Sequence, residues 1–266
     1  MNKTLRNKFS GSRQETILYG VVSMMVFLFI WYLVSQGQRI GRFFPSPFIV
    51  IKSFFVNFVV PIGRNTMWGH IFFSLQRVGI GFLIAVFIGI PLGLVMGCSR
   101  LGRAIFMPLF SIVRPIPGLA WIPLAILWFG LGNNSKYFLI CMTCLVGITL
   151  QTFYGAMYVD PVLIGAGRML GASKVQLFIN VIVPAAFPQI FAGLQGSFAN
   201  GWCAVIAAEM IRSNEGVGWI IFNGMNSTNT QQILVGMLAI GLVGLIIAEL
   251  LKVLERRLCS WRIQGQ

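Results

Sequence analysis

The side chains that could do chemistry in this chain are few and far apart. The only histidine, His70, and Asp160 stand too far apart in the sequence to form an acid–base cluster. Cys141 and Cys144 form a CxxC inside an apolar run, with no second pair, which favours small buried residues over a redox or zinc site. The sequence therefore predicts no catalytic residue and no metal site, and His70 is expected to be an exposed side chain at the mouth of a helix.

The sequence also lacks the usual phosphate-binding motif for ATP. No G-x-x-x-x-G-K-[ST] motif occurs, so the chain cannot cradle ATP phosphates by that route. We expect no cofactor in this chain, and any ATP must be hydrolysed by a separate subunit.

The composition predicts a membrane protein. Of 266 residues, 57% are hydrophobic and 10% are charged, and the mean hydropathy is +0.83. Soluble domains carry about 25% charged residues, so a soluble enzyme, a disordered chain and a secreted disulfide scaffold are excluded. The net charge of +14 would suit nucleic-acid binding in a soluble chain, but no basic stripe remains once the apolar runs are removed. We therefore expect lipid contacts and no nucleic acid.

Six apolar runs are long enough to cross a bilayer, which needs about 20 residues. They predict an all-α protein with six transmembrane helices. Arg114 interrupts the third run, and the prolines at 115, 117 and 123 are expected to break its helix. The first run is too long for a signal peptide and is interpreted as a retained helix. The runs cover residues 16–38, 78–99, 104–135, 137–159, 175–208 and 216–248.

Charge bias orients these spans. With both termini on the cytoplasmic side, the inner segments hold 12 Lys and Arg and the outer segments hold 6, as the positive-inside rule favours. The predicted organisation is a cytoplasmic tail, a first transmembrane helix, a periplasmic segment with an interfacial helix, a five-helix core and a second cytoplasmic tail. These parts cover residues 1–16, 17–36, 37–69, 70–256 and 257–266.

The segment between the fourth and fifth runs, residues 160–184, carries the strongest local signals. Asp160 followed by Pro161 marks the start of a helix, and Gly171 can end it. Ser173 can cap a second short helix. The product is a pair of short helices with a glycine elbow on the cytoplasmic side. Physical reasoning leaves two roles open: a loop lying on the membrane surface, or a docking element for a cytoplasmic partner.

The same segment resembles a family motif. The spacing A-x4-G-x9-[IV]-x-[LV]-P is that of the cytoplasmic motif of permease subunits of binding-protein-dependent ABC importers. The chain departs from the motif at its start, where Glu-Ala-Ala is replaced by residues 165–167, Gly-Ala-Gly. The matching residues are Ala166, Gly171, Val181, Val183 and Pro184.

The resemblance extends from about Pro45 to Arg257. Arg114-Pro-Ile-Pro117 and the run Ala208-Glu209-Met210 are similar to the branch of nitrate, sulfonate, taurine and bicarbonate permeases. The resemblance implies a type I ABC importer permease with a coupling-helix loop in a bacterial inner membrane. It implies a homodimer, two ATPase subunits that use ATP and Mg, and a solute-binding protein or lipoprotein that delivers a small oxyanion.

The resemblance also implies which residues couple to the ATPase and leaves the solute open. A heterocyclic solute such as a thiamine precursor is an alternative cargo. A channel or secondary carrier that needs no nucleotide is an alternative function. The expected coupling residues are Ala166, Gly167, Arg168, Leu170, Gly171, Ala172, Ser173, Val181 and Pro184.

Polar residues within the spans are candidates for the translocation pathway. Arg114 either attracts an anionic solute or extends to lipid phosphates near the cytoplasmic end. Glu209 either forms a structural ion pair, with Arg77 or Arg212, or contacts the binding protein or the substrate. The polar residues of the fifth run either line the pathway or bond to neighbouring helices. The pathway candidates are Arg114, Pro117, Gln195, Ser197, Asn200 and Glu209.

Small residues recur every four positions in two runs, at Gly89, Gly93 and Gly97 and at Gly193, Ser197 and Gly201. Such ladders let another helix backbone come close. We therefore expect tight helix packing along both.

Overall fold

A computed structural model describes residues 13–37, 44–211 and 213–258. The described residues are helical, and apart from one isolated bridge between Ile62 and Asn65 they contain no β-structure. Residues 1–12 and 259–266, which make up most of the two expected tails, and Arg212, a candidate partner of Glu209, lie outside them. The helices are α2 (Arg13–Ser35), α3 (Pro47–Val56), α4 (Met67–Cys98), α5 (Arg100–Val113), η1 (Gly118–Trp121), α6 (Ile122–Phe129), α7 (Asn133–Met157), α8 (Pro161–Met169), α9 (Lys174–Leu177), η2 (Phe178–Ile182), α10 (Val183–Met210), α11 (Val217–Asn226) and α12 (Thr230–Leu258).

The predicted all-helical, multi-span fold is confirmed. The described chain has five helices long and apolar enough to cross a membrane, or six if one bent pair forms a single span. That pair is α5 with η1 and α6, bent by 84°. The expected break in the span over residues 104–135 is therefore confirmed, and it follows Arg114. Pro115 and Pro117 cannot donate backbone hydrogen bonds and restrict the residues before them, so the helix breaks there.

The last predicted span, residues 216–248, is also divided. Its first part is the short helix α11, and the long helix α12 begins only at Thr230. Thr228 takes a positive φ of 55° in the turn between them. Asn229 then caps α12, because its Oδ1 accepts a hydrogen bond from the Gln232 amide at 3.1 Å. The turn folds α11 back along the start of α12.

The core lies where α7 packs between α4 and α10. The expected tight packing is confirmed on α4: a Cβ at Gly93 would lie 2.6 Å from Thr152 Cβ, and one at Gly97 would lie 2.6 Å from Ala156 Cβ. Cys141 and Cys144 are buried in the cluster between these helices, as predicted. Small residues on α4 thus bring the backbones of α4 and α7 into contact.

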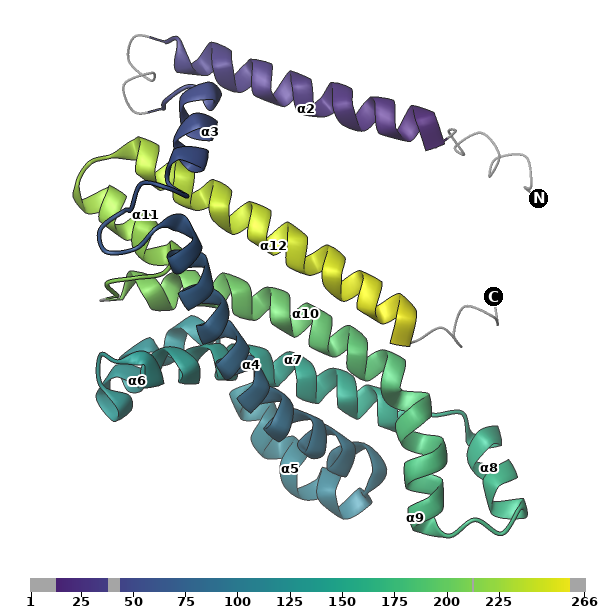
Figure 1. Cartoon of the computed structure of the whole chain (residues 1–266). Helices are drawn as coiled ribbons and strands as arrows, with labels where there is room; N and C mark the ends of the chain where they lie inside the picture. Colours follow the sequence, from purple (N-terminus) through teal and green to yellow (C-terminus); the bar gives the residue numbers. More distant parts are fainter. Residues whose placement is uncertain (1–12, 38–43, 212, 259–266) are drawn as a thin grey trace.

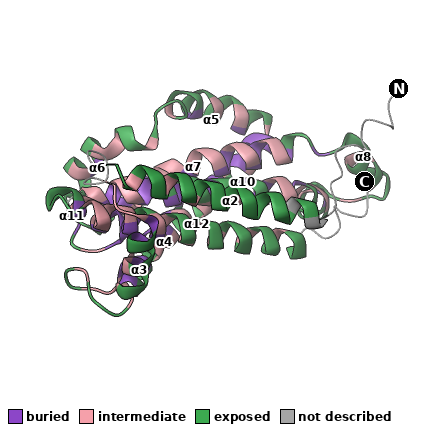
Figure 2. Cartoon of the chain, turned by 90° about the horizontal axis from the view of Figure 1, so that it is seen from above, coloured by how far each residue is buried: buried purple, intermediate pink, exposed green. Residues whose placement is uncertain are grey.

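The two ends of the bundle carry different elements (Figure 1). α8 and α9 lie at one end, together with the start of α2 and the end of α12. α3, α6 and α11 lie at the other end, an arrangement also visible in the turned view of Figure 2. In Figure 2 the outer helices, α2 above all, are mostly exposed, while buried residues gather inside the bundle.

The short helix α3 is too short to span, as expected, but it is also part of the packed bundle. Val50 and Phe54 are buried in a cluster with Val235 of α12 and Ile220 of α11. Beside it, Trp31 of α2 donates from its indole nitrogen to the Pro45 carbonyl oxygen at 3.2 Å. These contacts attach the α2–α3 segment to the end of the bundle that holds α11.

Candidate functional site

The loop between α7 and α10 folds as the sequence predicts. Asp160 caps α8: its Oδ1 accepts a hydrogen bond from the Val162 amide at 2.9 Å. Pro161 occupies the first turn, where its missing N–H costs nothing. Because proline fixes its own φ and the cap satisfies a free amide, the helix starts sharply at residue 161.

Gly171 forms the elbow. Its φ is +79°, a value that favours glycine. The Ala172 amide donates to the Gly167 carbonyl at 3.1 Å, and the Gly171 amide donates to the Arg168 carbonyl at 3.0 Å. These two bonds are the Schellman pattern that ends a helix. Space around Gly171 is open, since a Cβ there would meet no atom within 4 Å.

Ser173 starts the second helix through a capping box. Its hydroxyl oxygen accepts from the Gln176 amide at 3.3 Å, and Gln176 Oε1 accepts from the Ser173 amide at 2.8 Å. Two free amides at the start of α9 are satisfied in this way. The elbow therefore has a defined conformation even though most of it is exposed.

A wide turn joins α9 to α10. Residues Phe178–Ile182 form a π-helix, in which the Val183 amide donates to the Phe178 carbonyl. Pro184 follows and has no amide to donate. π-Helical turns are uncommon and are frequent at functional sites.

The two short helices pack against each other and leave a groove. A Cβ at Gly167 would lie 2.6 Å from Leu177 Cδ2, so the leucine side chain of α9 packs directly over the glycine of α8. The groove has a volume of about 560 Å³. Among the predicted coupling residues, the structure brings Gly167, Leu170, Val181 and Pro184 together around it. Ala172 is half-buried, and Ala166, Arg168, Gly171 and Ser173 are exposed.

The exposed surface of the elbow is apolar. Met169 is 86% exposed and Leu170 is 88% exposed, and Val162 and Val175 are also exposed. Large apolar side chains that stay exposed in a well-ordered turn mark an interaction surface. This surface fits either of the two roles left open by the sequence, a membrane surface or a protein partner.

The opposite end of the bundle holds a buried charge network. Arg77 Nη1 donates to Glu209 Oε1 at 2.7 Å, and Nη2 donates to Glu215 Oε1 at 2.9 Å. The Ser74 hydroxyl donates to the Glu209 carboxylate at 2.8 Å, and the Gly218 amide donates to it at 2.9 Å. The network ties α4, α10 and α11 together. Of the partners weighed for Glu209 in the sequence, the structure pairs it with Arg77.

His70 belongs to the same end and was misjudged from the sequence. Its side chain is fully buried rather than exposed. Nε2 donates to the Ile62 carbonyl at 3.0 Å, and Nδ1 accepts from the Gly216 amide at 3.0 Å. The ring stacks on Trp219 with a centroid distance of 5.3 Å. Both ring nitrogens are occupied, so His70 fastens the loop before α4 to the loop before α11.

The remaining pathway candidates are not gathered at one place. Arg114 is exposed at the end of α5, beside the break that contains Pro117. On α10, Ser197 is buried against Gly147 of α7, whereas Gln195 lines a cavity shared with α12. Asn200 is exposed. Successive helix positions differ by about 100°, so these three polar side chains do not share one face.

Residues 89–259 match the family described as binding-protein-dependent transport system inner membrane component. The taurine transport system permease protein TauC of Escherichia coli (strain K12) is 32% identical over 100% of this chain and 96% of its own length. The chain belongs to this family.

Further comparisons agree with that assignment. The nitrate import permease protein NrtB of Synechocystis is 32% identical over 94% of this chain and 92% of its own length. A chain of the MetNI methionine ABC transporter, solved in inward-facing conformations, has the same fold, with a TM-score of 0.62 at 18% identity. That match covers 70% of this chain and 92% of the other.

Membership in the family fixes several properties. The protein is a multi-pass membrane permease of an ABC importer and is the non-catalytic transport component. The ATP is used by an ATPase partner, and a binding protein is the other expected partner.

Within the described residues, no group of three His, Cys, Asp or Glu side chains could hold a metal ion.

Proposed function

We propose that this permease imports a small oxyanion by ATP-driven alternating access. The candidate solutes are taurine or another sulfonate, nitrate, and bicarbonate. Relatives named for taurine and for nitrate, each at 32% identity, support the solute class. The binding protein would select among these anions.

The elbow of α8 and α9 is the proposed docking site for the ATPase. The observation that supports it is the apolar, exposed and conformationally fixed surface around Gly171, Met169 and Leu170. Closure of an ATPase dimer on ATP binding would move two such elbows as rigid bodies. The spans attached to them would then rock between inward-open and outward-open states.

The proposed orientation puts α8, α9 and both termini in the cytoplasm of a bacterial cell, below its inner membrane. Basic residues at the α8–α9 end support it through the positive-inside rule. The binding protein would approach the opposite end, with α3 and α11. Two copies of this chain would form a homodimer around the pathway and would carry two ATPase subunits. The supporting basic residues are Arg100, Arg103, Arg168, Lys174, Lys252, Arg256 and Arg257.

Arg114 is the proposed anion contact within the pathway. α5 has 14 residues, which corresponds to a length of about 21 Å at roughly 1.5 Å per residue. The hydrocarbon core is about 30 Å thick, so a helix that starts at the cytoplasmic face would place Arg114 beyond the midplane rather than at the near surface. A charge at such a depth needs water or a partner. The broken backbone at Pro117 is tolerated where it lines a cavity.

A transport assay tests the proposal. The permease is purified with its ATPase and binding protein and reconstituted in proteoliposomes. Uptake of labelled taurine, nitrate, bicarbonate and a thiamine precursor is measured with and without ATP. We expect ATP-dependent uptake of one of these anions. Uptake without nucleotide would contradict the importer and support a channel or secondary carrier. ATP-dependent uptake of the thiamine precursor alone would contradict the proposal that the solute is an oxyanion.

A further inference from the structure

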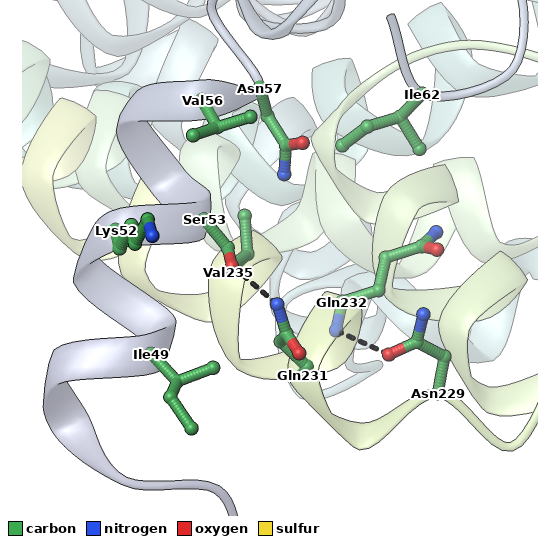
Figure 3. Close-up of a pocket in the computed structure, with 10 residues that line it drawn as sticks. All are labelled: Ile49, Lys52, Ser53, Val56, Asn57, Ile62, Asn229, Gln231, Gln232 and Val235. Carbon is green, nitrogen blue, oxygen red and sulfur yellow. Dashed lines mark hydrogen bonds between the residues drawn. The ribbon is translucent and has the colours of Figure 1, made fainter. Parts of the chain in front are cut away.

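A polar pocket opens between α3 and the start of α12 (Figure 3). These elements lie at the end of the bundle opposite α8 and α9 (Figure 1). Its volume is about 520 Å³, which lies within the range of ligand pockets. Four aliphatic side chains form part of its wall, and the rest is polar. The polar lining residues are Lys52, Ser53, Asn57, Asn229, Gln231 and Gln232.

The hydrogen bonds within the pocket leave donors free. Asn229 Oδ1 is occupied by the Gln232 amide, so its Nδ2 is the part of the side chain that remains for a ligand. Gln231 Nε2 donates to the Ser53 oxygen, so the proton of the Ser53 hydroxyl can point elsewhere. In Figure 3 both dashed bonds lie along the wall of the pocket, and the Asn229 nitrogen points away from the bond its oxygen accepts.

Asn57 and Lys52 add to this donor set from α3. The Asn57 side chain makes no hydrogen bond with another described residue, and in Figure 3 its amide reaches from the end of α3 toward the pocket. Lys52 is exposed and lines the pocket. Among the described residues Lys52 has no ion-pair partner, and no acidic side chain lines the pocket.

We propose that this pocket binds a small oxyanion, that is, a sulfonate, phosphate or carboxylate group. Lys52 would supply the charge, and Ser53, Asn57 and Asn229 would donate to the oxygens. Each of these groups presents several acceptor oxygens to such a donor set. A cation is disfavoured, because Lys52 would repel it and no carboxylate is present to bind it.

Two sources could supply this chemistry: a free anion in solution, or the head group of an anionic phospholipid. The pocket stands apart from the proposed import function, because anion binding here requires neither the ATPase nor translocation.

Amide hydrogen–deuterium exchange of the full-length chain in lipid nanodiscs tests the proposal. Sodium methanesulfonate is the free-anion probe, and sodium chloride at the same ionic strength is the reference. In phosphatidylcholine discs, we expect methanesulfonate to slow exchange in residues 47–58 and 228–235. Discs that contain phosphatidylglycerol, without methanesulfonate, test whether the lipid head group slows exchange in the same residues.

Variants separate the pocket from general salt effects. Lys52→Gln removes an exposed side chain and leaves the fold intact, and it should weaken the apparent affinity for the anion about tenfold, the size expected for one charge-assisted hydrogen bond. Asn57→Ala should weaken it by a smaller factor. Lys252→Gln, an exposed lysine near the other end of the molecule, should change nothing.

Each outcome decides the proposal. Slower exchange with methanesulfonate that needs an about tenfold higher anion concentration in Lys52→Gln assigns the free anion. Slower exchange only in phosphatidylglycerol discs, again dependent on Lys52, assigns the lipid head group. No change in either disc, or an equal change in Lys52→Gln, overturns the proposal. Because ATP and the ATPase are absent, none of these results depends on whether the importer assignment holds.

Discussion

Arg77 and Glu209 meet inside the bundle, where their side chains are 4% and 0% exposed. Bringing two charges out of water carries a high desolvation cost, and the additional bonds to Ser74, Glu215 and Gly218 offset it. Removing one charge should therefore cost more than removing both.

We predict that Arg77→Met destabilises the protein by about 3–5 kcal/mol, because it leaves the Glu209 carboxylate buried without its partner. The double variant Arg77→Met, Glu209→Leu should recover most of that loss. Thermal unfolding of the purified protein in detergent checks both. If the single variant unfolds at the same temperature as the wild type, the pair does not hold the bundle together.

Gly171 is the second residue whose role can be isolated. Gly171→Trp should abolish ATP-driven uptake while the protein remains folded, because a bulky side chain at the elbow would hold the ATPase surface away. Gly130→Trp is the matched control: Gly130 also has a positive φ, 73°, and open space around it, but it lies at the other end of the bundle.

A second control separates backbone strain from bulk. Asn tolerates a positive φ better than other side chains, so Gly171→Asn should keep more uptake than Gly171→Trp. Normal uptake by Gly171→Trp would show that the elbow is not the docking site.

Helix α4 packs closely against α7 only along one face, and glycine is needed only on that face. Gly93 lies against the Thr149 carbonyl, 2.7 Å from where a Cβ would be, whereas a Cβ at Gly79 would meet nothing within 4 Å. We predict that Gly93→Val prevents stable folding and that Gly79→Val is tolerated, as measured by yield of monodisperse protein and by unfolding temperature. Equal behaviour of the two would contradict the described packing.

The elements differ in how far their sequence determines them. The elbow was predictable because its signals are local: Asp160, Pro161, Gly171 and Ser173 each act on neighbouring residues. The break after Arg114 was predictable for the same reason, because Pro115 and Pro117 act on neighbouring residues. The bend of 84° was not predictable from such local signals.

Contacts between distant segments could be proposed from the sequence only as alternatives, or not at all. Arg77 was one of several candidate partners for Glu209, 132 positions away, whereas the contact between His70 and Gly216, 146 positions apart, was not anticipated. No periodicity or spacing links such pairs, so His70 was expected at the surface although it is buried. The polar pocket of α3 and α12 was missed for the same reason, since Ser53 and Gln231 lie 178 positions apart.

For the whole molecule, the proposed orientation makes a topological prediction. A green fluorescent protein fused after Gln266 should fluoresce, and alkaline phosphatase fused there should be inactive, because the end of α12 is proposed to be cytoplasmic. The same reporters inserted at Thr228, in the turn at the other end of α12, should give the opposite result. The reverse pattern would show that the protein has the opposite orientation in the membrane. In that orientation, a cytoplasmic ATPase could not reach α8 and α9.

The proposed coupling site between this permease and its ATPase is the elbow of α8 and α9. The most direct measurement is purification of the tagged chain from its native membrane in mild detergent, with mass spectrometry of the proteins that accompany it. We predict an ATPase with a G-x-x-x-x-G-K-[ST] motif in the wild-type preparation and its loss when Met169 and Leu170 are both changed to Glu. The same ATPase retained at full yield by that double variant would contradict the account.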